Sequence, residues 1–345
     1  MSTPKKILIT GGTGFIGSHT IIDLLEKGYE VISIDNLSRS KQFIADRIKE
    51  ITQKEFTNYR VDCRDLPKLR NIVSGHPGIV GIIHFAAFKS VSESVQKPMI
   101  YFDNNLNSTI NILRIAEEYN IPNFVFSSSC SVYGNTTELP VSELTPISAP
   151  ESPYGWTKLL AEQMIEAHAK TISSNFISLR YFNPVGAHSS GKIGEIPFAE
   201  PENLVPNITQ TAIGKKESFT VFGNNYDTRD GSCIRDYVHV MDIAEAHTLA
   251  LQYLIENKNT SNYEVFNLGS GVGISVLELI HAFEKVSGTQ LNYTIGEPRE
   301  GDVVSIYADN NKAKEILHWQ CKRDIEEMMR SAWNWEMEMQ KEQIS

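Results

Sequence analysis

The sequence predicts an α/β protein, built as a doubly wound parallel sheet with a smaller, discontinuous lobe in the C-terminal half. In the first half, short apolar strand-like segments alternate with amphipathic helical stretches. This alternation places helices on both faces of a parallel sheet. A glycine-rich turn follows the first strand. From about Pro184 the alternation gives way to a long segment rich in Gly, Pro and polar residues, which favours a second structural unit.

The expected strands are short and rich in Val, Ile and Phe, and they cover 5–10, 30–35, 58–62, 81–86, 123–129 and 176–182. Helices are expected over 14–27, 104–119 and 154–170. The second helix carries an apolar face made by Leu106, Ile110, Leu113 and Ile115. YEVFNLGSG (263–271) predicts another buried strand and turn, so the chain should return to the first domain. We therefore expect one domain from 1–184 with about 235–270, and a lobe from about 185–234 with 271–345.

The first strand leads into a glycine loop, GGTGFIGSH. Its glycines follow the G-x-G-x-x-G and G-x-x-G-x-x-G spacings, at Gly11, Gly12, Gly14 and Gly17. Glycines here permit a tight turn and close approach to a pyrophosphate, which the N-terminus of the next helix also attracts. The next strand ends in Asp35, a carboxylate suited to ribose hydroxyls. The loop predicts a Rossmann-type domain that prefers NAD over NADP, although the nearby Arg39 argues the other way.

The segment SPYGWTKLLAEQ (152–163) places Tyr154 and Lys158 four residues apart at the start of a predicted helix. Such positions share one helix face. An ammonium group beside a phenol favours the phenolate and lowers its pKa from about 10, which would make a base near neutral pH. The alternative interpretation of Tyr154 is an aromatic residue packed into the core.

Composition and patterning exclude several classes of protein. The formal charge of -10 argues against a nucleic-acid surface, and no apolar run reaches membrane-spanning length. The N-terminal segment has no leader pattern and the four cysteines form no CxxC pair, so we expect reduced thiols and a cytoplasmic location. A metal site is disfavoured, because the three-residue steps of Cys233, Asp236, His239 and Asp242 do not converge. His84 is interpreted as a hydrogen-bonded core residue.

These motifs together resemble the extended short-chain dehydrogenase/reductase family and, within it, the UDP-glucose 4-epimerases. The resemblance spans nearly the whole chain. It rests on TGGTGFIGSH, IDNLS, HFAAFKSVSESVQKP, DNN, FSSSCSVYG, SPYGWTK, RYFNPVGAH, NLVP, RDYVHVMD, NLGSGVG and REGD, in that order.

The resemblance implies that Ser129, Tyr154 and Lys158 form the catalytic group. Ser129 would hydrogen-bond the reacting sugar oxygen, Tyr154 would remove its proton, and Lys158 would hold the nicotinamide ribose. The implied reaction is the reversible 4-epimerisation of UDP-glucose and UDP-galactose. It runs through a 4-keto intermediate, with transient hydride transfer to tightly bound NAD.

The resemblance also implies two sets of binding residues. The cofactor set is Gly11, Gly14, Phe15, Ile16, Gly17, Asp35, Asn36, Leu37, Ser38, Arg39, Ser40, Asp62, Cys63, Phe85, Ala86, Ala87, Phe88, Lys89, Asn104, Ser129, Tyr154, Lys158 and Phe182. The substrate set is Lys89, Ser129, Tyr154, Asn183, Asn203, Leu204, Thr220, Val221, Phe222, Arg235, Arg299, Asp302 and Ile306. The arginines of the second set suit a diphosphate, because guanidinium binds phosphate oxygens in two places.

Some alternatives stay open. A related dehydratase is expected to carry an acidic residue just after the catalytic serine, where this chain has Cys130. A non-catalytic NAD-binding sensor is a further alternative. Ile306 stands where a bulky tyrosine would narrow the sugar pocket, which suggests additional activity on UDP-GlcNAc and UDP-GalNAc. The resemblance also implies a homodimer packed through the helices near 100–119 and 154–170, and Trp156 is expected on a different helix face from Tyr154.

Overall fold

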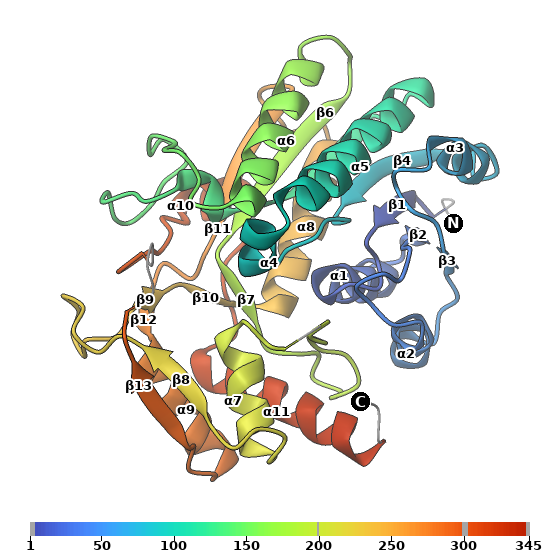
Figure 1. Ribbon diagram of the computed structural model, residues 1–345. Coiled ribbons are helices and arrows are strands. Elements are labelled where there is room, and N and C mark those ends of the chain that lie inside the picture. The colour runs from blue at the N-terminus through green and yellow to red at the C-terminus, as the bar shows by residue number, and fades with distance from the viewer. Residues whose placement is uncertain (1–3, 199, 299–302, 343–345) are drawn as a thin grey trace.

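The computed structural model describes residues 4–198, 200–298 and 303–342, and it confirms the α/β class (Figure 1). Its main sheet has seven strands, all paired in parallel. Across the sheet they are β11 (Tyr263–Leu268), β6 (Asn175–Tyr181), β5 (Asn123–Ser129), β4 (Ile79–His84), β1 (Lys6–Thr10), β2 (Glu30–Ile34) and β3 (Thr57–Tyr59). The order reverses between β1 and β4, where a doubly wound sheet opens a crevice for a ligand.

Helices cover both faces of this sheet. They are α1 (Phe15–Glu26), α2 (Phe43–Thr52), α3 (Leu66–Ser74), α4 (Val91–Gln96), α5 (Pro98–Glu118), α6 (Pro153–Ala169) and α8 (Val240–Ile255). One face packs Ile21 of α1 and Leu251 of α8 against the sheet. The other face packs Ile112 of α5 and Ile165 of α6. Both faces are therefore apolar, which explains why the strands are continuous apolar runs.

The return of the chain to the sheet is confirmed, since β11 pairs with β6 along its whole length. Phe266 and Leu268 of β11 are fully buried in the core beneath α8. The helix α10 (Asn311–Ile316) also comes back to this body, where Ala313 and Leu317 join the same core. The exact domain boundaries stay a prediction.

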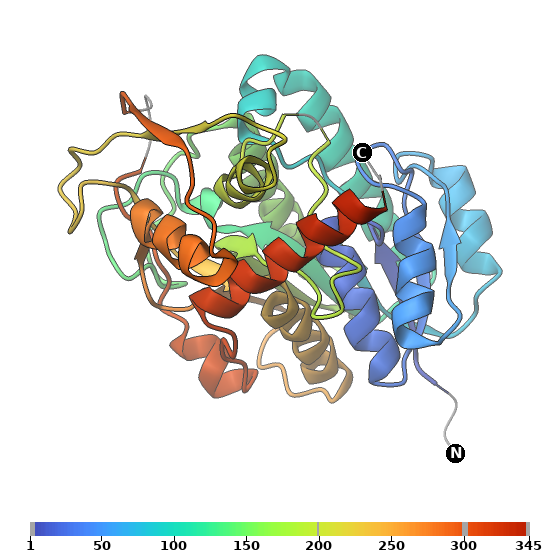
Figure 2. The same ribbon diagram turned by 90° about the horizontal axis from the view of Figure 1, so that it is seen from below.

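The smaller lobe lies below the carboxyl ends of the main strands (Figure 1). It contains α7 (Leu204–Ala212), α9 (Val276–Ser287) and α11 (Ile325–Lys341), with the strand pairs β7 (Asn183–Val185) and β10 (Tyr237–His239), β9 (Ile234–Arg235) and β12 (Ile274–Ser275), and β8 (Phe219–Phe222) and β13 (Tyr293–Gly296). Ile208, Phe219, Phe283 and Met329 form its separate core. In Figure 2, α11 runs across the underside of the molecule toward α2, where Arg47 pairs with Glu342.

Some predicted boundaries were wrong. The strand expected at 58–62 ends at Tyr59, because the Asp62 side chain accepts the backbone N–H of Arg64 and turns the chain. Helix α5 begins six residues earlier than expected, at Pro98, a residue favoured at the first helical position. Ile110 is only partly buried and lies outside the apolar core cluster, in which Ile112 packs instead.

In the described part of the chain, no helix is long and apolar enough to cross a membrane.

Candidate active site

The carboxyl end of β5 and the first turns of α6 bring the three predicted catalytic residues together. Ser129 is the last residue of β5, and its hydroxyl lies close enough to Tyr154 to oppose the rise of the phenol pKa. The Lys158 ammonium donates to the carbonyl of Ser127 at 2.6 Å and lies 5.9 Å from the centre of the Tyr154 ring. Local sequence begins the helix at this place, since Ser152 caps it and Pro153 occupies its first turn.

Burial sets the charge state of this group. Loss of water around the Tyr154 hydroxyl raises its pKa to about 12, against the favourable hydrogen bond with Ser129. Burial likewise lowers the pKa of Lys158 to about 7, although the nearby Glu162 carboxylate opposes this. The sequence predicted that the ammonium beside the phenol lowers the pKa of Tyr154, and in the chain alone that pKa is raised instead. A lysine only partly charged at neutral pH does not offset the desolvation, so a further positive charge is needed.

The glycine loop forms a cradle that side chains would fill. Gly11 has a φ of +72°, and a Cβ there would lie 2.8 Å from the backbone nitrogen of Ala86. A Cβ on Gly17 would lie 2.2 Å from the carbonyl oxygen of Gly11. The α1 N-cap, Gly14, offers no side chain to the first N–H groups of the helix. These backbone N–H groups are therefore available to bind an anion, and the loop fits a dinucleotide phosphate.

The residues after β2 fit an unphosphorylated ribose. Asp35 is nearly buried, and its carboxylate accepts from Leu37 N at 2.8 Å and Ser40 Oγ at 3.0 Å. The Arg39 guanidinium lies between the rings of Phe88 and Phe198, with centroid distances of 4.5 and 4.1 Å.

Arg39 also pairs with Glu93 at 2.9 Å. Because the guanidinium is engaged by two rings and a carboxylate, it does not offer a free cation for a 2′-phosphate. The sequence left Arg39 as an argument for NADP, and these contacts of its guanidinium favour NAD instead.

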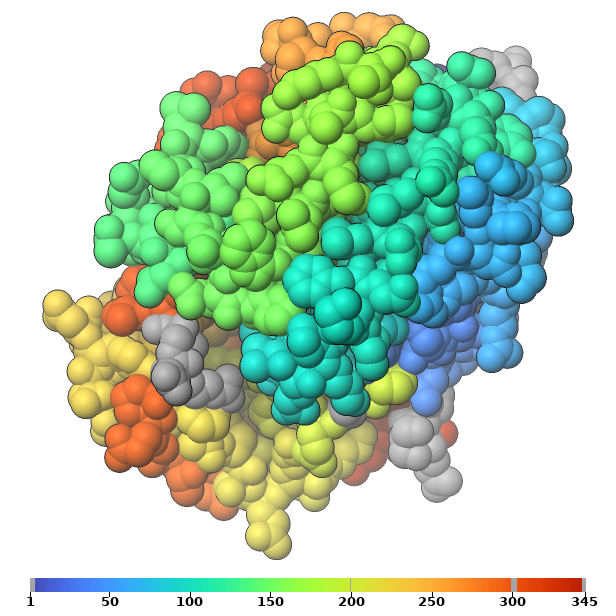
Figure 3. Space-filling model, turned by 45° about the horizontal axis from the view of Figure 1, so that its top comes forward, coloured from blue at the N-terminus to red at the C-terminus, as the bar shows by residue number. Residues whose placement is uncertain are grey.

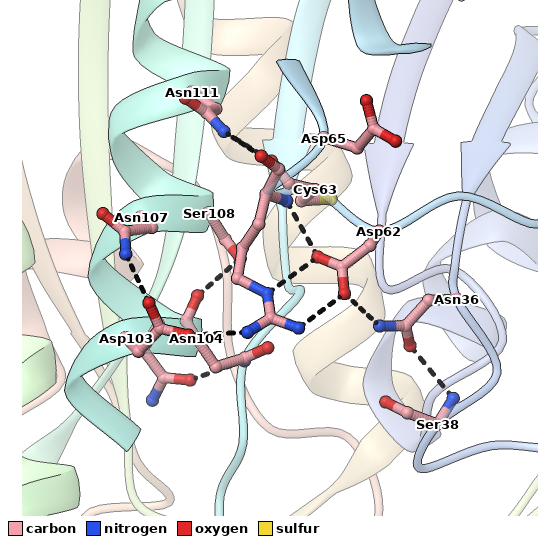
Figure 4. Close-up of polar contacts among 12 residues, drawn as sticks. Asn36, Ser38, Asp62, Cys63, Asp65, Asp103, Asn104, Asn107, Ser108 and Asn111 are labelled. Carbon is pink, nitrogen blue, oxygen red and sulfur yellow. Dashed lines mark hydrogen bonds and ion pairs between the residues drawn. The ribbon is translucent and has the colours of Figure 1, made fainter. Parts of the chain in front are cut away.

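A polar depression of about 550 Å³ follows β3, lined by Asp62, Arg64, Asp65, Asp103, Asn107 and Asn111. Figure 4 shows the Asp62 carboxylate beside Asn36, on the same loop as Cys63. The Asp62 carboxylate accepts from the backbone and guanidinium of Arg64 and from Asn36 Nδ2. These bonds hold the Asp62 pKa at about 2.

The four hydrogen bonds to Asp62 fill the acceptor positions of one carboxylate. An adenine amino group would therefore bind Asp62 only if Arg64 or Asn36 gave up a bond. Arg64, which also pairs with Asp103 at 2.6 Å, is a residue that the sequence interpretation missed. Its signal was the Asp-x-Arg spacing directly after a strand.

The other predicted cofactor residues lie around the same edge of the sheet. Phe85, Ala86, Ala87, Phe88 and Lys89 follow β4, and Ile16 and Phe15 begin α1. Asn104 on α5 and Cys63 are buried, and burial raises the pKa of the Cys63 thiol. Ser38 donates its backbone N–H to Asn36 Oδ1 at 2.9 Å. Phe182 follows β6 and packs in a small core cluster with Ile306.

The predicted substrate residues sit mainly in the smaller lobe. They are Asn183 on β7, Leu204 at the start of α7, Thr220, Val221 and Phe222 on β8, and Arg235 on β9. The Arg235 guanidinium donates to the carbonyl of Val303 at 2.6 Å, next to the buried Ile306. Arg299 and Asp302 lie outside the described residues.

One carboxylate, Glu195, joins residues of both predicted sets. Lys89 Nζ lies 2.5 Å from Glu195 Oε1, and Asn203 Nδ2 donates to the same oxygen at 2.9 Å. Glu195 belongs to the irregular segment between β7 and α7, which the sequence correctly placed as a loop. Its role was missed, because nothing in the sequence pairs a loop glutamate with a lysine 106 residues away.

The residues weighed as a metal site make other contacts. The residues described include no grouping of His, Cys, Asp and Glu suited to a metal ion. Asp236 instead accepts from Ser270 and Ala308, and Asp242 pairs with Arg323. The interpretation of His84 is confirmed, since its buried ring bonds Thr10 at 2.6 Å and Thr109 at 3.2 Å.

Comparisons with known proteins identify relatives of the whole chain. The sequence model of the family described as GDP-mannose 4,6 dehydratase matches residues 8–332. A UDP-glucose 4-epimerase of Bacillus subtilis (strain 168) is 45% identical over 331 residues, which make up 96% of this chain and 96% of that protein.

Two solved structures are also similar. UDP-glucose 4-epimerase from Stenotrophomonas maltophila, with bound NAD and formylated UDP-arabinopyranose, has a TM-score of 0.94, 41% identity, and coverage of 98% of this chain and 99% of that one. The enzyme from Bifidobacterium longum, in complex with NAD+ and UDP, has a TM-score of 0.91, 42% identity, and coverage of 97% and 98%.

Gly17→Ala should weaken NAD binding at least about tenfold, because the new methyl group would collide with the Gly11 carbonyl and distort the phosphate cradle. Bound NAD per chain after purification, followed by calorimetric titration with NAD, measures the loss. Gly75→Ala is the matched control, since its Cβ would make an ordinary contact of 3.4 Å at the end of α3. Equal NAD affinity of Gly17→Ala and the control would contradict the assignment of the cradle.

Proposed function

The chain belongs to the UDP-glucose 4-epimerase family, and from this membership we propose that it interconverts UDP-glucose and UDP-galactose with bound NAD. The observation that carries the proposal is the meeting of Ser129, Tyr154 and Lys158 at the carboxyl end of β5, beside the glycine cradle. It is an isomerase reaction with no net redox change, so the cofactor is restored in each cycle.

The bound NAD would accept a hydride from C4 of the sugar and return it to the opposite face of the 4-keto intermediate. Tyr154 takes the proton of the 4-hydroxyl while the C4–H bond breaks. When hydride returns to C4, Tyr154 gives the proton back to the same oxygen. Ser129 donates a hydrogen bond at the same oxygen. Inversion at C4 by proton transfer alone is unfavourable, because the C4 hydrogen is not acidic.

Lys158 supplies part of the positive charge near the phenol and is the candidate to hold the nicotinamide ribose. In the chain alone the pKa of Tyr154 is about 12, so at neutral pH the phenolate is scarce. A positive nicotinamide ring next to the phenol favours the phenolate. The tyrosine is therefore a competent base mainly when oxidised cofactor is present, which ties proton removal to hydride acceptance.

The diphosphate end is assigned to the smaller lobe. Asn183 donates its backbone N–H to the carbonyl of Asp236, the residue after Arg235, and Arg299 is a further candidate outside the described residues. Lys89, which follows β4 of the main sheet, and Asn203, which precedes α7 of the smaller lobe, both hydrogen-bond Glu195. We assign these groups to the UDP moiety, since guanidinium and ammonium groups suit phosphate oxygens.

A dehydratase of the same fold is the alternative that the matched family model raises. Elimination is expected to need an acidic residue beside the catalytic serine, and the chain has Cys130 there. Burial raises the pKa of the Cys130 thiol to about 12, so this group is a poor proton donor at neutral pH. The chemistry of the site thus favours epimerisation.

We also propose that the protein is a cytoplasmic homodimer. Apolar side chains on α4, α5 and α6 face outward, namely Val91, Val95, Met99, Ile100 and Trp156. Figure 3 shows these three helices side by side on one face of the molecule. An apolar patch of this kind is costly in water, and a second copy presenting the same helices would cover it. Cys63, Cys130 and Cys321 are free thiols, as a reducing compartment allows.

Purified protein given UDP-galactose without added NAD should form UDP-glucose, and no 4-keto-6-deoxy product. Tyr154→Phe should lower kcat at least about 100-fold, because the proton acceptor is lost. Tyr119→Phe is the control, since that hydroxyl bonds Arg70 on the surface. An undiminished rate in Tyr154→Phe would refute the mechanism, and absence of UDP-glucose from the wild-type reaction would refute the function.

Ile306 should permit turnover of UDP-GlcNAc beside UDP-glucose. It is buried next to Phe182 and Val132, so a larger side chain would crowd the sugar side of the cluster. Ile306→Tyr should lower kcat/KM for UDP-GlcNAc at least about tenfold more than for UDP-glucose. No detectable wild-type turnover of UDP-GlcNAc would count against the hypothesis.

Met99→Asp should shift the protein toward a monomer in sedimentation equilibrium, because it places a charge in the middle of the apolar patch. Leu144→Asp is the matched control, since Leu144 is 93% exposed in the loop before α6. If the wild-type protein is itself monomeric at micromolar concentration, the dimer proposal fails.

A further inference from the structure

A row of polar side chains lies under the catalytic pair and takes no part in the reaction described above. Ser128, Arg180 and Asn267 are register partners on the adjacent strands β5, β6 and β11. Partners in a parallel register point to one face of the sheet. Glu162 of α6 reaches this row, so a buried carboxylate meets a buried guanidinium within the interior of the domain.

The ion pair between Glu162 and Arg180 is anchored on every side. Arg180 Nη2 lies 2.6 Å from Glu162 Oε2, and Arg180 Nε lies 3.0 Å from Oε1. The Ser128 hydroxyl also donates to Glu162. Arg180 Nη1 donates to Tyr133 at 2.9 Å, and the Tyr133 hydroxyl donates to Asn267 at 2.7 Å. Both charged side chains are at most 6% exposed, so the geometry of the carboxylate is fixed.

This fixed carboxylate stands one helical turn beyond Lys158. Tyr154, Lys158 and Glu162 form a stripe with steps of four residues along α6. Each contacts one of three consecutive serines at the end of β5. Lys158 bonds the carbonyl of Ser127, Glu162 accepts from Ser128, and Ser129 is the serine whose hydroxyl acts on the Tyr154 phenol. The stripe therefore sets how α6 lies along the end of β5.

The charge of Glu162 also acts on Lys158. Burial lowers the pKa of Lys158, and Glu162 is the group that opposes this shift. The ionisable groups that face Lys158 or Glu162 from the surrounding elements are His84 on β4, His247 on α8, Arg180 on β6 and Tyr263 on β11. Burial holds the pKa of His84 at about 3 and that of His247 at about 4, so both rings are neutral where Lys158 titrates.

We propose that Glu162 is a positioning residue for the active site: its carboxylate, held by Arg180 and Ser128, keeps the Lys158 ammonium charged and placed opposite Tyr154. Arg180 fixes the carboxylate, and the carboxylate supports the one cation that the chain itself places beside the phenol. The proposal rests on the proposed function for its effect on turnover, whereas its effect on Lys158 is independent of turnover.

The test is a pH titration of Lys158 in the Glu162→Gln variant. The ¹³Cε resonance of labelled lysine in the purified protein reports the protonation of Lys158. The resonance is assigned from its loss in Lys158→Met, and all variants are compared in the same cofactor state. Glu162→Gln should lower the midpoint of Lys158 by about one pH unit, because a charge at helical-neighbour distance is lost. The alkaline limb of kcat/KM for UDP-galactose should move down in pH by the same amount.

Arg180→Lys is the matched control. It keeps a cation beside Glu162 but breaks the two-point contact, so it should lower the Tm while leaving the Lys158 midpoint unchanged. If Glu162 had only a structural role, the two variants would alter stability and kcat together and neither would move the midpoint. An unmoved midpoint in Glu162→Gln would overturn the proposal.

Glu162→Gln leaves Arg180 as a buried cation without its carboxylate, which can prevent folding. The double variant Glu162→Gln with Arg180→Gln removes both charges and avoids this. It should still lower the Lys158 midpoint, by less than Glu162→Gln because the Arg180 cation is lost as well, and a wild-type midpoint in that variant would overturn the proposal. If the wild-type protein has no epimerase activity, the proposed function fails, but the titration still decides the role of Glu162.

Discussion

The contact between the first turns of α6 and the end of β5 is the constraint on which the site depends. Ser127 and Ser128 hydrogen-bond Lys158 and Glu162 of one helix stripe, and these bonds hold Tyr154 of the same stripe near Ser129. The apolar sheet faces make this contact rigid, because α6 also packs Ile165 into a filled core. A shift of α6 along β5 would separate all three pairs at once.

The same burial that orders the site opposes its chemistry. A buried phenol resists ionisation, and a buried ammonium resists protonation. Within the described part of the chain, the protein compensates only in part, through the carboxylate of Glu162 and the carbonyl of Ser127. A site arranged in this way has an inactive base until a cation from outside the chain enters, which couples reactivity to cofactor binding.

The two lobes share apolar packing, since Trp335 and Met339 of α11 lie in the same core cluster as Ile21 and Leu251, and polar and aromatic contacts join them as well. Glu195 meets Lys89, Glu202 accepts from Ser90 at 2.7 Å, and Phe198 lies against Arg39. All these partners come from the segment between β7 and α7 on one side and from loops of the main sheet on the other. These contacts tie the segment between β7 and α7 to the loops at the carboxyl edge of the main sheet.

The sequence by itself determined the fold class, the glycine loop, the catalytic candidates and the return of the chain in β11, because these depend on local patterns: apolar runs, glycine spacing and a helix start. Tertiary structure alone decided the rest. It fixed the pKa of Tyr154, since burial depends on residues far apart in the chain, and it engaged Arg39 and Asp62 with partners that no spacing indicates. It also paired Glu162 with Arg180, because two side chains become neighbours only when a helix packs on a sheet.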